Sequence, residues 1–192
     1  MIGVAGAERH SRVRWAAALA LLAACVTWAQ PVAYRIDPAR TQAEFEVEHL
    51  GVFKAHGRFG NVSGSVAFDA SSRSGAIDLA IPVASVATGW DARDAFLRGA
   101  SMFDAQRFPR IRFASTRFAF DEGRLVRVEG ELTLRDVTRP VALLVRTMRC
   151  EGGACNAEAA AVIRRREFGM EAWWPLIDDE VTLQLRLVAT RE

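Results

Sequence analysis

Residues 181–187 read Val-Thr-Leu-Gln-Leu-Arg-Leu, so every second side chain in this stretch is apolar. Successive side chains of a β-strand point to opposite faces of the sheet, and this alternation therefore gives a strand one apolar and one polar face. Residues 126–134 repeat the pattern, with valines and leucines alternating with charged or polar residues. Such a period of two is typical of antiparallel sheets that have one dry face and one wet face.

The alternation extends over most of the chain. About eight strands are expected, at residues 41–49, 62–69, 77–83, 110–115, 126–134, 141–145, 157–165 and 181–187. Turn-forming residues such as Gly60-Asn61 and the glycines at 152–153 separate them, and the strand that begins at residue 110 changes phase in its second half. Because closure removes exposed strand edges, these strands predict an all-β fold, an eight-stranded antiparallel barrel.

One segment interrupts the strands. Residues 89–109 lack the period of two, and residues 91–98 have a helical composition, with Phe96, Leu97 and Phe103 available for apolar contacts. We therefore expect one short helical insertion near residues 91–104.

The first 29 residues have the pattern of an export signal. Three arginines precede an apolar run at residues 15–24, and the small residues Thr27 and Ala29 fit cleavage before Gln30. The run is too short to span a bilayer, and no later stretch reaches the roughly 18 apolar residues that a spanning helix needs. This interpretation gives a signal peptide at 1–29, a single domain at 30–192, a periplasmic location and no transmembrane span in the mature chain.

A second processing route also fits the sequence. Residues 22–25 read Leu-Ala-Ala-Cys, which matches a lipobox, and Cys25 would then be lipidated and become the mature amino terminus. The alternative is that Cys25 is a small apolar residue inside the export signal. Both routes place the domain outside the cytoplasm.

Charge and cysteine content narrow the class of partner. Removing residues 1–29 takes away three arginines and one glutamate from a chain of net charge +2, which leaves a net charge of zero. A neutral surface gives no electrostatic basis for binding nucleic acid.

In an oxidising compartment the close pair Cys150 and Cys155 predicts a disulfide that clips a hairpin. No second Cys or His pair accompanies them, so zinc is not expected.

The interior of an eight-stranded barrel is either filled by side chains or holds one small ligand. The alternation fits both cases. A ligand in this interior would have to be apolar, because an unpaired polar group would lose its hydrogen bonds on entering.

Several stretches of the mature chain, in order, resemble the YceI-like family of polyisoprenoid-binding periplasmic proteins. They are His-Leu-Gly-Val-Phe-Lys-Ala-His-Gly-Arg-Phe at 49–59, Arg-Asp-Ala-Phe-Leu-Arg at 93–98, Met-Phe-Asp at 102–104, Phe-Pro-Arg-Ile-Arg-Phe at 108–113, Gly-Glu-Leu-Thr-Leu-Arg-Asp-Val-Thr-Arg-Pro-Val at 130–141 and Arg-Glu-Phe-Gly-Met at 166–170. The resemblance runs from Tyr34 almost to the carboxyl terminus. It implies a lipocalin-like barrel that holds a polyisoprenoid or an isoprenoid quinone in its interior.

The chain departs from the family at Ala95 and Phe96, where a polar residue and a histidine commonly precede the leucine. Any role of that histidine is therefore in doubt here. The Cys150–Cys155 pair looks like an addition within a subfamily.

The candidate ligand-binding residues are mostly aromatic or apolar and are expected to line the tunnel or its mouth, although ordinary core packing explains each of them as well. They are Phe53, Arg58, Phe59, Arg93, Phe96, Leu97, Phe103, Phe168, Met170, Trp173 and Trp174. Trp173 and Trp174 are interpreted as a lid.

Arg58 and Arg93 have two interpretations. Either guanidinium can meet a diphosphate or a quinone carbonyl, and Arg93 can equally pair with Asp94 or Asp104, which is the interpretation we favour. Arg164, Arg165 and Arg166 are expected to face outward on a strand.

The two histidines of the mature chain are expected to be structural. His49 has an inward position and His56 follows in a turn, with no carboxylate at ligand spacing, so no metal is predicted.

The sequence contains no G-x-S-x-G, HExxH, P-loop or GxGxxG motif, and no catalytic residues are predicted. The expected function is a non-enzymatic carrier of a polyisoprenoid or isoprenoid quinone, with no further cofactor. Two alternatives are an enzyme acting on such a lipid or on an oxidant at the barrel mouth, and an outer-membrane barrel, whose alternation would be the same. The oligomeric state is open, with a homodimer as one option.

Overall fold

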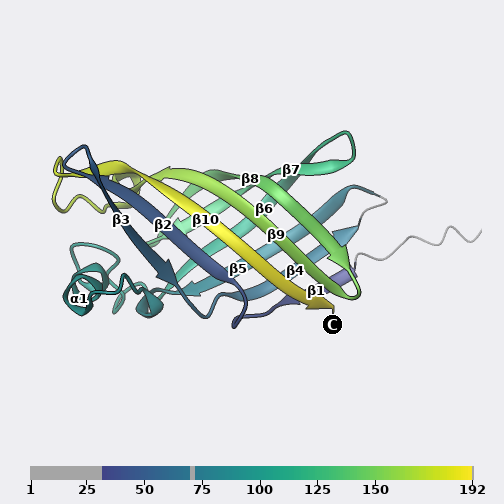
Figure 1. Ribbon diagram of the computed structural model, residues 1–192, viewed down its shortest axis with the longest axis horizontal. Coiled ribbons are helices and arrows are strands. Elements are labelled where there is room, and N and C mark those ends of the chain that lie inside the picture. Colours follow the sequence, from purple (N-terminus) through teal and green to yellow (C-terminus); the bar gives the residue numbers. More distant parts are fainter. Residues whose placement is uncertain (1–31, 70–71, 192) are drawn as a thin grey trace, which may run out of the picture.

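A computed structural model describes residues 32–69 and 72–191, which form antiparallel strands and one α-helix (Figure 1). The strands are β1 (Val32–Ile36), β2 (Gln42–His49), β3 (Phe53–Phe59), β4 (Ser63–Asp69), β5 (Ser74–Pro82), β6 (Arg110–Asp121), β7 (Arg124–Leu134), β8 (Val137–Glu151), β9 (Ala154–Arg164) and β10 (Ile177–Arg191). The helix is α1 (Asp91–Arg98), and single 3₁₀ turns occupy Val83–Ser85 and Arg165–Phe168. The predicted signal segment and Cys25 lie outside the described residues.

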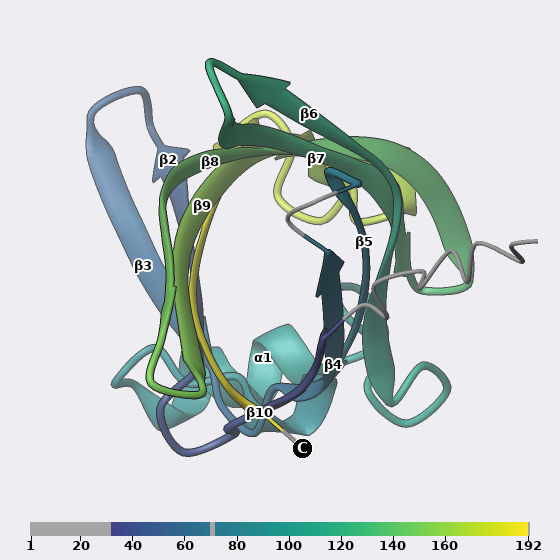
Figure 2. The same ribbon diagram turned by 90° about the vertical axis from the view of Figure 1, so that its right-hand side faces the viewer.

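The strands close into a ring. Hydrogen-bonded neighbours follow the order β1-β4-β5-β6-β7-β8-β9-β10, and β10 pairs with β1 again. Seen from the end that carries the chain's carboxyl terminus, these eight strands surround a common axis and α1 lies behind the lower part of the ring (Figure 2). The predicted eight-stranded antiparallel barrel with one short helix is confirmed.

The strands β2 and β3 extend the barrel at the end where α1 lies. β10 pairs with β2 as far as Arg186 and then with β1 from Ala189 onward. At the kink between β1 and β2 the hydroxyl of Thr41 donates to the carbonyl of Val188 and accepts from its amide, both at 3.1 Å. The kink therefore leaves no unpaired backbone group on β10 at that point.

The strand β3 was not predicted, and His56 lies in this strand rather than in a turn. The reason is Gly57, which pairs with Phe45 of β2 and lies under its ring. A Cβ at residue 57 would be 2.2 Å from the Cζ of Phe45. A large apolar side chain has no room there. Of the alternating positions 53, 55, 57 and 59 of β3, only Phe53 and Phe59 are large, so the alternation is weaker than in the other strands. β1, which has only five residues, was missed as well.

The predicted phases of the other strands agree with the structure. In β7 the side chains of Val128, Leu132 and Leu134 are buried, as expected from their spacing. The predicted phase change in β6 is a register shift between Ser115 and Arg117 against β7.

The predicted disulfide is present. Cys150 and Cys155 pair directly across β8 and β9, and their sulfurs are bonded at 1.98 Å. The bond is next to the β8–β9 turn, and this turn lies at the end of the barrel opposite to α1 (Figure 1). Within the described ranges, no helix is both long enough and apolar enough to cross a membrane.

Candidate ligand-binding site

The barrel is not filled by its own side chains. A cavity with room of about 210 Å³ for the centres of water-sized molecules lies inside it, partly open to the outside and with an almost wholly apolar wall. A single water needs roughly 10–15 Å³ of such space, so the cavity is an order of magnitude larger than a one-water void. The wall includes Ile81, Phe113, Leu143 and Leu185, which come from β5, β6, β8 and β10.

The segment around α1 covers one end of this cavity. Phe96 and Leu97 of α1 and the following Met102 and Phe103 are on the cavity wall. The ring centroid of Phe59 lies 5.5 Å from that of Phe45 and 5.4 Å from that of Phe103. These contacts attach the inserted segment to β2 and β3.

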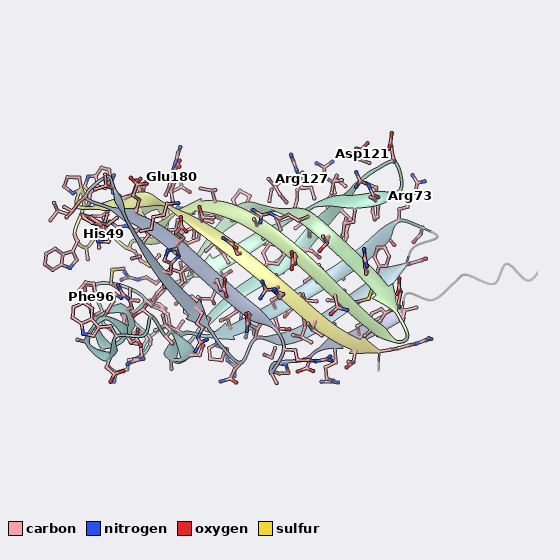
Figure 3. The ribbon with its side chains drawn as sticks, viewed as in Figure 1. His49, Arg73, Phe96, Asp121, Arg127 and Glu180 are labelled. Carbon is pink, nitrogen blue, oxygen red and sulfur yellow. A yellow bond between two sulfur atoms is a disulfide. The ribbon has the colours of Figure 1, made fainter. Side chains whose placement is uncertain are left out.

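The loop between the 3₁₀ turn 165–168 and β10 faces α1 across this end of the barrel. Met170 and Ile177 are on the cavity wall, and the rings of Trp173 and Phe96 are 6.3 Å apart in an edge-to-face arrangement. The cavity therefore reaches the end of the barrel formed by α1 and this loop, which we call the mouth. Figure 3 shows Phe96 there, at the same end as His49 of the β2–β3 hairpin.

Six of the predicted ligand-binding residues line the cavity. They are Phe59, Arg93, Phe96, Leu97, Phe103 and Met170. Their contact with a ligand remains a prediction.

The other five predicted residues lie off the cavity wall. Phe53 is exposed at the start of β3, because the β2–β3 hairpin extends past the closed ring. Arg58 is exposed and borders a second depression, which Asp94 also lines. Phe168 is 1 % exposed but packs outside the cavity. Trp173 and Trp174 are exposed at the mouth.

The predicted direct ion pair of Arg93 with an aspartate is wrong. Its guanidinium donates to Thr88, from Nε to Oγ1 at 2.8 Å and from Nη2 to the carbonyl oxygen at 3.0 Å. Thr88 in turn donates from its amide, at 2.7 Å, and from its hydroxyl, at 2.5 Å, to Oδ1 of Asp94. Arg93 and Asp94 are thus joined through a threonine at the cavity wall.

The buried Asp94 is held in its ionised form. The hydrogen bond from the Thr88 hydroxyl is the largest cause that lowers the pKa of Asp94 below its ordinary value, burial opposes it, and the Thr88 amide and two arginines add to the lowering. The charge of Asp94 therefore ties the 88–90 turn to the first turn of α1.

Arg165 is a residue of the cavity wall whose position the sequence did not predict. It was expected to face outward, yet it is 2 % exposed and lies on the cavity wall. Its guanidinium donates to four backbone carbonyls, of Met170 (2.6 Å), Asp178 (2.7 Å), Ile177 (2.8 Å) and Ala172 (2.9 Å). Burial lowers the pKa of Arg165, with smaller effects of both signs from neighbouring charges.

A signal for Arg165 was present in the sequence. Ala161 and Ile163 are buried on the inner face of β9, and Arg165 continues their period of two. Its position in a run of three arginines obscured this phase. Arg164 and Arg166 on either side are exposed, as predicted.

The two histidines have different surroundings. His49 is half-buried beside Phe53, at 5.5 Å between ring centroids, and its Nδ1 is buried with no hydrogen-bond partner among the described residues. Nδ1 of His56 lies 3.4 Å from a carboxylate oxygen of Glu46 on the outer face. No group of three or more His, Cys, Asp or Glu residues arranged to hold a metal occurs in ranges 32–69 and 72–191.

A closed antiparallel barrel with an apolar cavity inside defines the lipocalin-like class of architecture. Residues 34–189 match the YceI-like domain, and the chain belongs to this family.

Relatives and solved structures agree with this assignment. The chain is 31% identical over 186 residues to a UPF0312 protein of Pseudomonas aeruginosa, covering 92% of this chain and 97% of the relative. It is 30% identical over 167 residues to a UPF0312 protein of Photorhabdus laumondii, covering 83% and 86%. The crystal structure of Burkholderia cenocepacia BcnA is similar with a TM-score of 0.74 and 26% identity, over 81% of this chain and 99% of that one.

A second solved structure has the same fold at a lower sequence identity. A polyisoprenoid binding domain from Saccharophagus degradans, implicated in plant cell wall breakdown, has a TM-score of 0.68 at 19% identity. The similarity covers 84% of this chain and 99% of that domain.

Proposed function

We propose that this protein is a non-enzymatic carrier that holds one apolar, chain-like lipid, a polyisoprenoid or an isoprenoid quinone, inside its barrel. The observation that carries the proposal is the cavity, whose wall is almost wholly apolar and which reaches the mouth. Membership of the YceI-like family and the polyisoprenoid-binding domain of the same fold support the same class of ligand.

The wall favours such a ligand on physical grounds. Each buried methylene contributes about 0.8 kcal/mol, so a chain of several isoprene units can bind without specific polar contacts. A polar ligand would lose its hydrogen bonds to water against this wall. The polar residues of the wall near α1 include Thr88 and Arg93, and the head group of the lipid would face them.

The proposed location is the periplasm. The Cys150–Cys155 disulfide is typical of proteins that fold in an oxidising compartment, which supports an exported domain. The predicted export signal, with either cleavage site, leads to the same location.

The proposal is tested by extracting protein purified from bacteria with organic solvent and identifying the lipid by mass spectrometry. We expect an isoprenoid lipid in an amount comparable to that of the protein. Delipidated protein should take up the same lipid when it is added back.

The control is a protein of similar size purified from the same strain by the same steps. Absence of any isoprenoid lipid from the extract, together with failure of the delipidated protein to take one up, would contradict the proposal.

A further inference from the structure

Most of the large apolar side chains that the protein exposes are gathered at the mouth. Among the described residues nine such side chains are exposed, and seven of them belong to three segments at this end of the barrel. These seven, the apolar rim, are Leu50, Val52 and Phe53 at the β2–β3 turn, Trp90 before α1, and Trp173, Trp174 and Leu176 in the loop before β10. Their exposed fractions run from 47% to 75%.

Contacts join the segments of the apolar rim. The amide of Leu50 donates to the carbonyl of Leu176 at 2.8 Å, which holds the hairpin turn against the loop. Trp173 contacts Phe96 of α1, and Phe96 is on the cavity wall. The hairpin turn and the loop are therefore joined in one apolar surface that continues through Phe96 into the cavity, and Trp90 directly precedes the helix that carries Phe96. Exposed apolar patches of this kind mark interaction sites.

The opposite end of the barrel has a different surface. Its turns contain Asp-Glu-Gly at 121–123 and Glu-Gly-Gly at 151–153, and Figure 3 shows Arg73 and Asp121 there. None of the nine exposed apolar side chains of the described residues belongs to these turns. A general excess of surface hydrophobicity therefore does not explain the apolar rim.

The composition of the apolar rim fits the interface of a bilayer. Three of its members are tryptophans, which concentrate at the boundary between lipid chains and head groups. Two of these indoles carry a guanidinium over the ring, Arg166 at 4.7 Å from Trp174 and Arg93 at 5.8 Å from Trp90. Cations beside inserted aromatic rings are complementary to anionic lipid head groups.

We propose that the apolar rim docks the mouth of the barrel on the surface of an anionic lipid bilayer. The proposal rests on the proposed function, because docking lets a lipid pass between membrane and cavity without exposing its chain to water. The opposite end, where Arg191 and the disulfide lie, then points away from the bilayer.

The test is sedimentation with vesicles of phosphatidylethanolamine and phosphatidylglycerol at about 3:1, using protein made from the complete chain. Two rim variants are compared with wild type, Trp173→Asn/Trp174→Ser in the loop and Leu50→Asn/Val52→Ser in the hairpin turn. Asn is chosen at Leu50 and Trp173 because these residues have φ values of 54° and 62°. The matched control is Leu144→Ser/Val162→Ser, which removes two exposed apolar side chains from β8 and β9 that do not belong to the apolar rim.

We expect wild type to sediment with the vesicles. The partition coefficient onto vesicles should be lower than that of wild type by roughly tenfold or more for each rim variant, and within about twofold of wild type for the control. Wild type that stays in the supernatant, or a control that loses as much as the rim variants, overturns the proposal. A third outcome also overturns the proposal: wild type is a dimer, the rim variants are monomers, and no form binds vesicles. The apolar rim would then be the contact between two copies of the chain.

Extraction of lipid from the same samples separates the two proposals. Isoprenoid lipid in the wild type without vesicle binding contradicts docking and leaves the carrier function standing. Rim-dependent vesicle binding by a protein that holds and takes up no isoprenoid lipid supports docking and contradicts the carrier function.

Discussion

Gly57 shows how a single missing side chain shapes the cavity wall. The ring of Phe45 occupies the place where a Cβ of residue 57 would stand, and it contacts Phe59 on the wall. Gly57→Ala should therefore displace Phe45 and lower the free energy of unfolding by about 1–3 kcal/mol, as overpacking of a core does. Denaturation with urea measures the change.

Gly60→Ala is the matched control for this prediction. No atom lies within 4 Å of a Cβ placed at residue 60, so the expected change is within about 0.5 kcal/mol. Equal stability of Gly57→Ala and wild type would show that the Phe45 ring is free to move.

Arg165 fixes the loop at the mouth from inside the protein. Replacement by Met leaves four carbonyls without their donor, and we expect the free energy of unfolding to fall by about 3 kcal/mol or more. Arg165→Lys, with fewer donors in a less rigid arrangement, should lie between Met and wild type.

The control for Arg165 is its neighbour Arg164, whose exposed guanidinium lies 4.0 Å from Glu167. Exposed pairs of this kind contribute little, so Arg164→Ala should change stability by less than about 1 kcal/mol. A similar effect of both substitutions would mean that the four carbonyls find water as a replacement donor.

At the scale of elements, Asp94 connects α1 to the turn that precedes it. Its pKa is lowered chiefly by the Thr88 hydroxyl, so the folded protein favours the carboxylate over the acid. The stabilisation is fully present above the unfolded pKa of about 4 and is lost as pH falls through the lower folded pKa. The difference in Tm between wild type and Asp94→Asn should be constant above about pH 5 and should shrink as the pH falls below about 4.

Asp91→Asn is the control, since it removes a charge from the same helical turn at an exposed position. Its effect on Tm at neutral pH should be smaller than that of Asp94→Asn. A difference between wild type and Asp94→Asn that does not depend on pH would contradict a role for the Asp94 charge.

The elements that sequence reasoning found are those with an uninterrupted pattern. β7 and β10 alternate over many residues, and α1 was placed at residues 91–98, where the structure has it. β3 was not predicted because two of its alternating positions hold the small Ala55 and Gly57, which makes the pattern weak. The link between Arg93 and Asp94 was missed because it passes through Thr88, which carries no charge.

At the scale of the whole molecule, alternation predicts that strands close around a common interior and does not predict what the interior holds. Filled and hollow barrels have the same period of two, and only the relative sizes of inward side chains at one level of the barrel distinguish them. Small residues such as Ala43, Ala55 and Ala159 lie on the cavity wall among larger ones. Strand pairing determines which inward side chains lie at the same level of the barrel. The pairing depends on kinks such as the one at Thr41, and no local sequence pattern predicts such a kink.

The claim on which the account depends is that a lipid occupies the space beside Ala159. Ala159→Phe places a ring in the cavity, whereas Ala160→Phe makes the same change on the outer face of β9, next to the exposed Leu144. The measurement is the amount of isoprenoid lipid that each purified variant retains, with circular dichroism to show that both are folded. We predict that Ala160→Phe retains as much as wild type and that Ala159→Phe binds the lipid roughly tenfold more weakly or worse. Equal lipid content in folded Ala159→Phe and wild type would contradict the interior site.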